Sequence, residues 1–101
     1  MSMNLIPGTQ QYAGDSDLAV GQSGKPTRVY SIEAISGGTA CTIQLFNGID
    51  NTSTKQFAQL DGVINKSVVI NYSEGKLFPA GCFVDTGANM TYMTVVFSQE
   101  F

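Results

Sequence analysis

The chain has 101 residues, of which 43% are hydrophobic and 13% are charged, and its formal net charge is −3. This length allows one domain and leaves no room for a second hydrophobic core. The five Lys and Arg residues are scattered, which argues against nucleic acid as a partner, and the apolar runs are too short to cross a membrane as a helix. Eleven glycines and many Thr, Ser, Asn and Gln residues predict an all-β domain with tight turns.

Residues 1–24 differ from the rest of the chain, because turn-forming residues interrupt them and their apolar residues follow no regular period. We expect an extended N-terminal arm here and a β-sandwich domain over 25–101. The arm either wraps its own domain or lies on a neighbouring subunit. In the second case, the contact with the neighbour must offset the conformational entropy lost when the arm is ordered, about 1–2 kcal/mol per residue. The candidate interface residues are Leu5, Ile6, Tyr12, Leu18, Val20 and the C-terminal Phe101.

The first regular segment is Arg28–Ile35, a predicted strand with Tyr30, Ile32 and Ala34 on one face. The two glycines of Ser36–Thr39 then predict a tight hairpin into a second strand. We therefore expect these two strands to pair with each other.

Further strands are expected at 40–46, 55–60, 67–72 and 90–98. In the last of them Thr91, Met93, Val95 and Phe97 share one face, while the other face carries Met90, Tyr92 and Val96. This strand is therefore apolar on both faces, which indicates that a further surface covers its outer face. Turn signals recur at intervals of roughly 8–12 residues and no segment has a helical period. The sequence therefore predicts a single antiparallel β-sandwich or jelly-roll-like barrel of six to eight strands.

The densest apolar run, Leu77–Asp85, contains the two residues least compatible with a regular strand. Pro79 has no N–H for a ladder, and Gly81 can adopt backbone angles that other residues avoid. We predict a structural corner here that takes the chain from one sheet edge toward the other. Cys82, which follows the corner, and Cys41 are predicted to be small buried thiols, and a disulfide between them is possible but not implied.

The residues that could carry chemistry are few. The chain contains no His, which removes the commonest general base and the commonest zinc ligand, and its two cysteines lack a metal-site spacing. Asp15, Asp17 and Asp50 adjoin turns, where capping of the local backbone is a better explanation than calcium binding. A catalytic carboxylate pair such as Glu33 with Asp85 cannot be placed from the sequence. We expect no enzyme activity, no cofactor and no metal.

The four tyrosines, together with the Asn and Gln content, leave a sugar-binding face as an alternative. Tyr30, Tyr72 and Tyr92 occupy strand positions where a half-buried core role is commoner.

Three stretches, Gly24–Tyr30, Ser36–Ala40 and Leu77–Asp85, resemble small β-sandwich virion proteins of tailed, especially marine, bacteriophages. The resemblance covers about residues 24–97 and contains structural turns and core residues without a catalytic signature. It implies a homo-oligomeric structural protein that is made in the host cytoplasm and built into the virion. The expected role is a head decoration or cement subunit on the major capsid protein. The alternatives are a subunit that joins tail or neck proteins, a fibre-associated subunit, and a carbohydrate-binding module on the virion surface.

Overall fold

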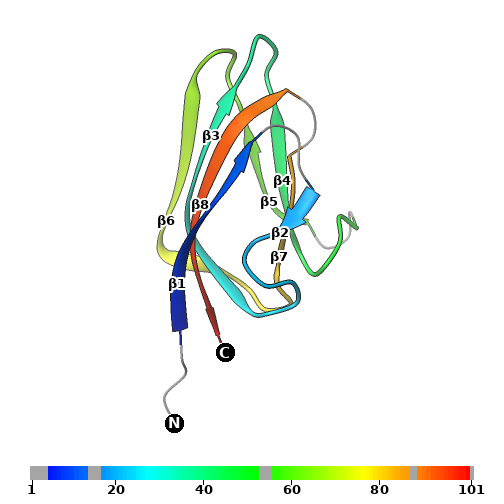
Figure 1. Cartoon of the computed structure of the whole chain (residues 1–101), viewed down its shortest axis with the longest axis vertical. Helices are drawn as coiled ribbons and strands as arrows, with labels where there is room; N and C mark the ends of the chain where they lie inside the picture. The colour runs from blue at the N-terminus through cyan, green and yellow to red at the C-terminus, as the bar shows by residue number, and fades with distance from the viewer. Residues whose placement is uncertain (1–4, 14–16, 53–55, 87–88, 101) are drawn as a thin grey trace.

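The computed structural model describes residues 5–13, 17–52, 56–86 and 89–100 (Figure 1). Within these ranges the chain forms eight strands in two four-stranded antiparallel sheets. The two sheets pack face to face, so the predicted all-β sandwich is confirmed. A helix long and apolar enough to span a membrane is not found in the described ranges.

The first sheet has the strand order β1-β8-β3-β6. Its strands are β1 (Leu5–Ala13), β8 (Met90–Glu100), β3 (Thr27–Ser36) and β6 (Ser67–Phe78). The second sheet has the order β2-β7-β4-β5. Its strands are β2 (Asp17–Ala19), β7 (Cys82–Asp85), β4 (Thr42–Asn47) and β5 (Gln56–Asp61). The sheet edges are therefore β1 and β6 in the first sheet and β2 and β5 in the second.

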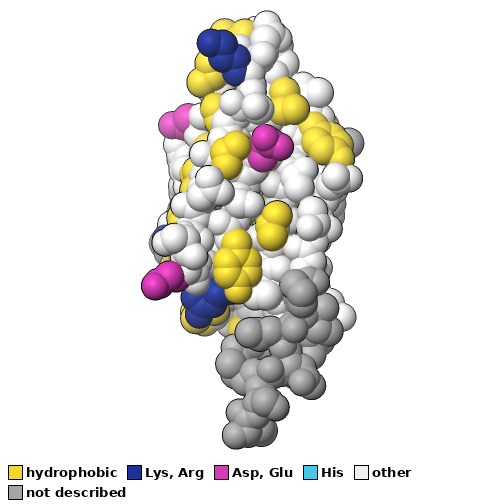
Figure 2. All heavy atoms as spheres, turned by 90° about the vertical axis from the view of Figure 1, so that its left-hand side faces the viewer, with side chains coloured by type: hydrophobic (Ala, Val, Ile, Leu, Met, Phe, Trp, Pro, Cys, Tyr) yellow, Lys and Arg dark blue, Asp and Glu magenta, His cyan; other side chains and the backbone are white. Residues whose placement is uncertain are grey.

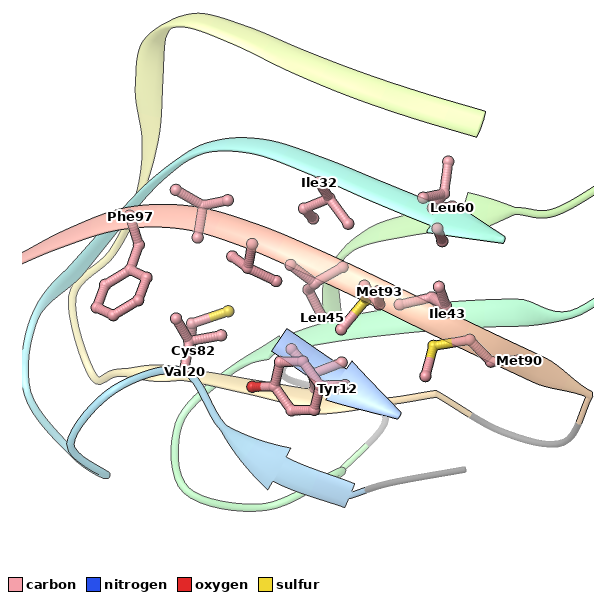
Figure 3. Close-up of a cluster of buried hydrophobic side chains, with 14 of the residues drawn as sticks. Tyr12, Val20, Ile32, Ile43, Leu45, Leu60, Cys82, Met90, Met93 and Phe97 are labelled. Atoms are coloured by element: carbon pink, nitrogen blue, oxygen red, sulfur yellow. The ribbon is translucent and has the colours of Figure 1, made fainter. Parts of the chain in front are cut away.

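The core lies between the sheets and takes side chains from the inner face of each (Figure 3). In β8 the alternation is regular from Met93 to Phe97, and Met93, Val95 and Phe97 lie on one face, as predicted, and point inward. In β3 it is not, because a bulge between Val29 and Ser31 shifts the register against both neighbouring strands. Val29 is therefore buried, and Tyr30 is only partly buried, contrary to the prediction.

The N-terminal segment belongs to the sandwich. β1 pairs with β8 over nine residues, and β2 pairs with β7, so the segment is extended, as expected, and lies on its own domain. Tyr12 and Val20 are 2% and 0% exposed and sit in the chain's own core, which corrects their assignment to an interface with a neighbour. The division at residue 24 does not separate an arm from a domain.

The other candidate interface residues are only partly placed. Leu5 and Ile6 lie opposite Glu100 and Gln99, and Leu18 lies opposite Val84. The side chains of Leu5, Ile6 and Leu18 and the whole of Phe101 lie outside the described part of the chain.

The predicted hairpin at Ser36–Thr39 is wrong. β3 already has β8 on one side and β6 on the other, so no edge is left for β4, which lies in the second sheet. The segment is a crossover between the sheets. Its ends are tied by the bond from Gly37 N to Asn89 O (3.1 Å) and by that from Ser36 Oγ to Cys41 Sγ (3.0 Å).

The corner at Pro79–Gly81 joins β6 to β7 and takes the chain from one sheet to the other, as predicted. Gly81 adopts φ 101°, and its N–H bonds to Phe78 O at 3.1 Å. Asn47 Oδ1 accepts a bond from Ala80 N at 2.8 Å, which fixes the corner against the end of β4. The chain does not reach the far edge, because β2 lies outside β7.

Candidate assembly surface

The residues considered for catalysis or metal binding are not gathered in one place. Glu33 lies on β3 of the first sheet, whereas Asp85 lies on β7 of the second. Asp50 Oδ1 accepts bonds from Thr52 N (3.2 Å) and Thr52 Oγ1 (2.7 Å), which is the predicted turn-capping role. Asp15 falls outside the described residues, and Asp17 is in β2. In the described ranges, no group of three or more His, Cys, Asp or Glu side chains could hold a metal ion.

Both cysteines are buried free thiols, as predicted, with Cys41 2% and Cys82 1% exposed. Cys41 precedes the start of β4, whereas Cys82 pairs with Asn47 at its end. At about 3.3 Å per strand residue the two thiols are roughly 15–20 Å apart, too far for a disulfide. Burial raises the pKa of the Cys82 thiol to about 12, so the thiol stays protonated at neutral pH.

The tyrosines do not form a common face. Tyr12 is in the core, and Tyr72 packs against it from the inner side of β6. The hydroxyl groups of Tyr30 and Ser98 are joined by a hydrogen bond of 3.0 Å. Only Tyr30 and Tyr92 are therefore left to serve a sugar-binding face.

Gln99 is an organising residue that the sequence analysis missed. Its Nε2 donates to Val20 O (3.0 Å), Gln22 O (3.0 Å) and Thr27 Oγ1 (2.9 Å), and its Oε1 accepts from Gln22 N (2.9 Å). The side chain is 2% exposed and ties the turn after β2 to the last strand. Its position in the sequence could have indicated this role, because Gln99 lies two residues after Phe97 and alternate side chains of β8 from Met93 onward point inward.

Of the four sheet edges in the described structure, β1 is interrupted, β2 is short, and β5 is half as long as β6. β1 contains Pro7, and its side chains Gln10 and Tyr12 bond to Ala19 O at 2.9 and 3.1 Å, which closes the sandwich on that side. β2 has three residues and β5 has six. Proline, short length and covering contacts are the usual means of protecting an edge from pairing with other chains.

The edge of β6 is different. β6 has twelve residues and contains no Pro, and among the described strands it pairs only with β3, over residues 67–71 and 76–78. A nine-residue stretch of this edge, residues 66–74, lies between two residues with left-handed backbone angles, Asn65 (φ 56°) and Gly75 (φ 77°). We call this stretch, KSVVINYSE, the open edge. Its only charged residues are the exposed Lys66 and Glu74 at its two ends.

The backbone groups of the open edge alternate in direction. Ser36 N donates to Lys66 O at 3.4 Å, and the register of β6 with β3 is unbroken from Ser67 to Asn71, so Val68 and Ile70 turn their backbone groups toward β3. The N–H and C=O groups of Ser67, Val69 and Asn71 then point away from the sheet. Beyond Gly75, the ring of Phe57 from β5 lies against Phe78, with ring centroids 5.5 Å apart and planes tilted by 35°.

The outer face of the first sheet beside the open edge carries apolar side chains. Val69 is 49% exposed, and Ile35 and Val96 are each 38% exposed. The register places these three residues on the same face as Glu33. Figure 2, which looks onto the β6 side of the molecule, shows hydrophobic side chains spread among uncharged polar ones, with few charged groups. Within the described part of the chain, the second surface expected over the outer face of β8 is not present.

No protein-family model matches the chain, and no curated protein matches it. Among solved structures, the chain is similar to one from Bacillus endospore appendages, which "form a novel family of disulfide-linked pili". The TM-score is 0.53 at 8% sequence identity, and the match covers 100% of this chain and 90% of the other. At this identity the likeness supports the fold, an all-β sandwich.

Proposed function

We propose that the chain is a non-enzymatic structural subunit that acts by assembling with other subunits. The observation that carries this proposal is the open edge at residues 66–74, which adjoins the apolar outer face around Val69. Unpaired strand backbone with apolar neighbours favours pairing with another chain, and monomeric proteins usually protect such edges. β1 and β2 have that protection and β5 is half as long as β6, so the exposure of β6 fits a surface kept for assembly.

Within this class, the assembly that we propose is a phage virion, with the chain as a head decoration subunit that stabilises the capsid by contacts with neighbouring subunits and the major capsid protein. The support is the resemblance of three stretches to phage β-sandwich proteins. One of them, Leu77–Asp85, forms the corner that joins the sheets. A tail, neck or fibre position uses the same assembly surface and is the alternative within the virion.

A filament subunit is the second candidate, favoured by the whole-chain fold likeness to the endospore pilus chain. Such a filament would differ from disulfide-linked pili in its chemistry. The only two cysteines of the sequence are Cys41 and Cys82, and both are buried in the core. We therefore expect assemblies of this chain to dissociate equally in detergent with and without a reducing agent.

The test is mass spectrometry of virus particles purified from the producing culture, combined with electron microscopy of the purified chain. A virion subunit is expected in the particles at many copies. If the chain is absent from the particles and the purified chain forms filaments, the filament assignment replaces the virion assignment. A chain that is absent from particles and remains monomeric contradicts both assignments.

A further inference from the structure

We infer that two copies of this chain pair through the open edges of their β6 strands, antiparallel about a two-fold axis at Ile70. The first sheets of the two copies then form one continuous eight-stranded sheet. This inference rests on the proposed function and deepens it by naming the partner, a second copy of the chain, and the surface.

The position of the axis follows from the limits of the open edge. Asn65 and Gly75 have left-handed backbone angles, with φ 56° and 77°, so they bound the longest unbroken run of extended backbone at this edge, residues 66–74. Ile70 is the midpoint of residues 66–74. A two-fold pairing that uses the whole stretch must therefore be centred on Ile70.

The side chains on the two halves of the stretch are complementary in this register. Lys66 lies opposite the partner's Glu74, and the same contact occurs again at the other end of the interface. Ser67 lies opposite the partner's Ser73, and Val68 lies opposite the partner's Tyr72. Ile70 meets the partner's Ile70 at the axis. Opposite charges and apolar pairs directly across two strands each stabilise the pairing.

The backbone also suits this register. The backbone groups of Val69 and Asn71 point outward, so Val69 would exchange bonds with the partner's Asn71, and Asn71 with the partner's Val69. These two pairs give about four inter-chain backbone hydrogen bonds. Ile70 and the partner's Ile70 then form a non-hydrogen-bonded pair, where side chains across two antiparallel strands come closest.

The neighbouring registers are less favourable. A shift of the axis to Val69 places Lys66 opposite the partner's Tyr72 and Glu74 opposite the partner's Ile64, so neither charge meets an opposite charge. A register in which even residues face odd ones sets the inner side chains of one copy against the outer side chains of the other. Charge complementarity therefore selects the axis at Ile70.

The experiment measures the monomer–dimer equilibrium of the full chain by sedimentation. The wild type is expected to dimerise, and the variants Lys66→Glu and Glu74→Lys are each expected to dimerise at least tenfold more weakly, because both attractive contacts become repulsive. A mixture of the two variants restores both contacts and is expected to give a heterodimer close to wild-type affinity. Lys25→Glu makes the same change in net charge as Lys66→Glu, at an exposed residue outside the open edge, and should dimerise like the wild type.

A wild type that stays monomeric at high concentration, single variants that dimerise like the wild type, or a mixture without heterodimers would each overturn the β6 pairing. This failure is distinguishable from failure of the proposed function. If the charge variants still enter particles or filaments as the wild type does, the chain is an assembly subunit that uses another surface. If the wild type enters neither, the proposed function itself is wrong.

Discussion

Lys66 and Glu74 close the two ends of the open edge of β6 with opposite charges, each four residues from Ile70. The residues between them are uncharged, and an uncharged apolar edge alone could pair with other strands in several registers. Two terminal charges of opposite sign restrict this choice, because only one antiparallel register brings both into contact with their opposites. The same nine residues therefore provide both the attraction and the specificity of the proposed pairing.

The end of the open edge depends on Gly75. Its φ is 77°, and a Cβ at this position would overlap Cγ of Arg28. We expect Gly75→Ala to lower the free energy of unfolding by about 1–3 kcal/mol, measured by urea denaturation. Gly38→Ala is the matched control, because a Cβ there meets no atom within 4 Å. It should leave stability unchanged or raise it by up to about 1 kcal/mol. Equal effects of the two substitutions would contradict the assigned role of Gly75.

Gln99 should be one of the most sensitive polar residues of the chain. Gln99→Met keeps the length of the side chain but leaves Val20 O and Gln22 N without their partner. We expect a loss of about 2–4 kcal/mol in the free energy of unfolding, since buried polar groups without hydrogen bonds are costly. Gln59→Met, at an exposed position of β5, is the control and should change stability by less than about 0.5 kcal/mol. A neutral Gln99→Met would show that the network does not hold the turn.

The sequence predicted where strands occur better than how they pair. Alternation correctly placed Met93, Val95 and Phe97 on one face of the last strand, which is the core face, and Pro79 with Gly81 marked a true corner. The hairpin prediction at 36–39 failed because turn-forming glycines also suit a crossover, and local composition does not show that β3 has two other partners. The bulge at Tyr30 is likewise a property of strand pairing and is not visible in one strand alone.

The candidate surface was also only partly predictable. The apolar outer face of the last strand was expected from Val96 and its neighbours, and the structure leaves Val96 38% exposed. The open edge was not predicted, because an edge is defined by the absence of a neighbouring strand, which depends on the whole topology. Tyr12 and Val20 were placed at an interface since their segment has no period. The segment nevertheless contributes to the core, because Tyr12 lies in β1, whose pattern Pro7 and Gly8 interrupt, and Val20 follows β2, which has only three residues.

The position of Tyr12 and Val20 changes the expectation for truncation. On an arm that lies on a neighbour, deletion of residues 1–23 would weaken assembly more than it lowers the melting temperature. The structure instead predicts that the isolated truncated chain is itself unfolded at room temperature. The deletion removes β1, β2 and two buried side chains, which exceeds the few kcal/mol by which small domains are stable. Thermal melting followed by circular dichroism tests this prediction. An unchanged melting temperature would show that residues 1–23 are an arm and do not stabilise the domain.

Alkaline pH should destabilise the fold. Burial raises the pKa of Cys82 to about 12, and burial, with a smaller effect of Cys82, raises the pKa of Tyr12. In the unfolded chain these groups ionise near pH 9 and 10. The contribution of the buried neutral forms to the free energy of unfolding is therefore fully present below about pH 9. It is lost as the pH rises toward 12, by at most about 1.4 kcal/mol per pH unit per group. Melting temperatures across this interval test the prediction, and a flat profile up to pH 11 would contradict it. Tyr12→Phe should reduce the slope.

Residue-resolved amide hydrogen exchange, measured by NMR at low and at high protein concentration, tests the central claim most directly. The account predicts that the amides of Val69 and Asn71 exchange rapidly in the dilute monomer and become protected as dimers form. The amides of β5, at an edge of the other sheet, should not change. Protection of Val69 and Asn71 that is independent of concentration, while association is seen by sedimentation, would contradict assembly through β6.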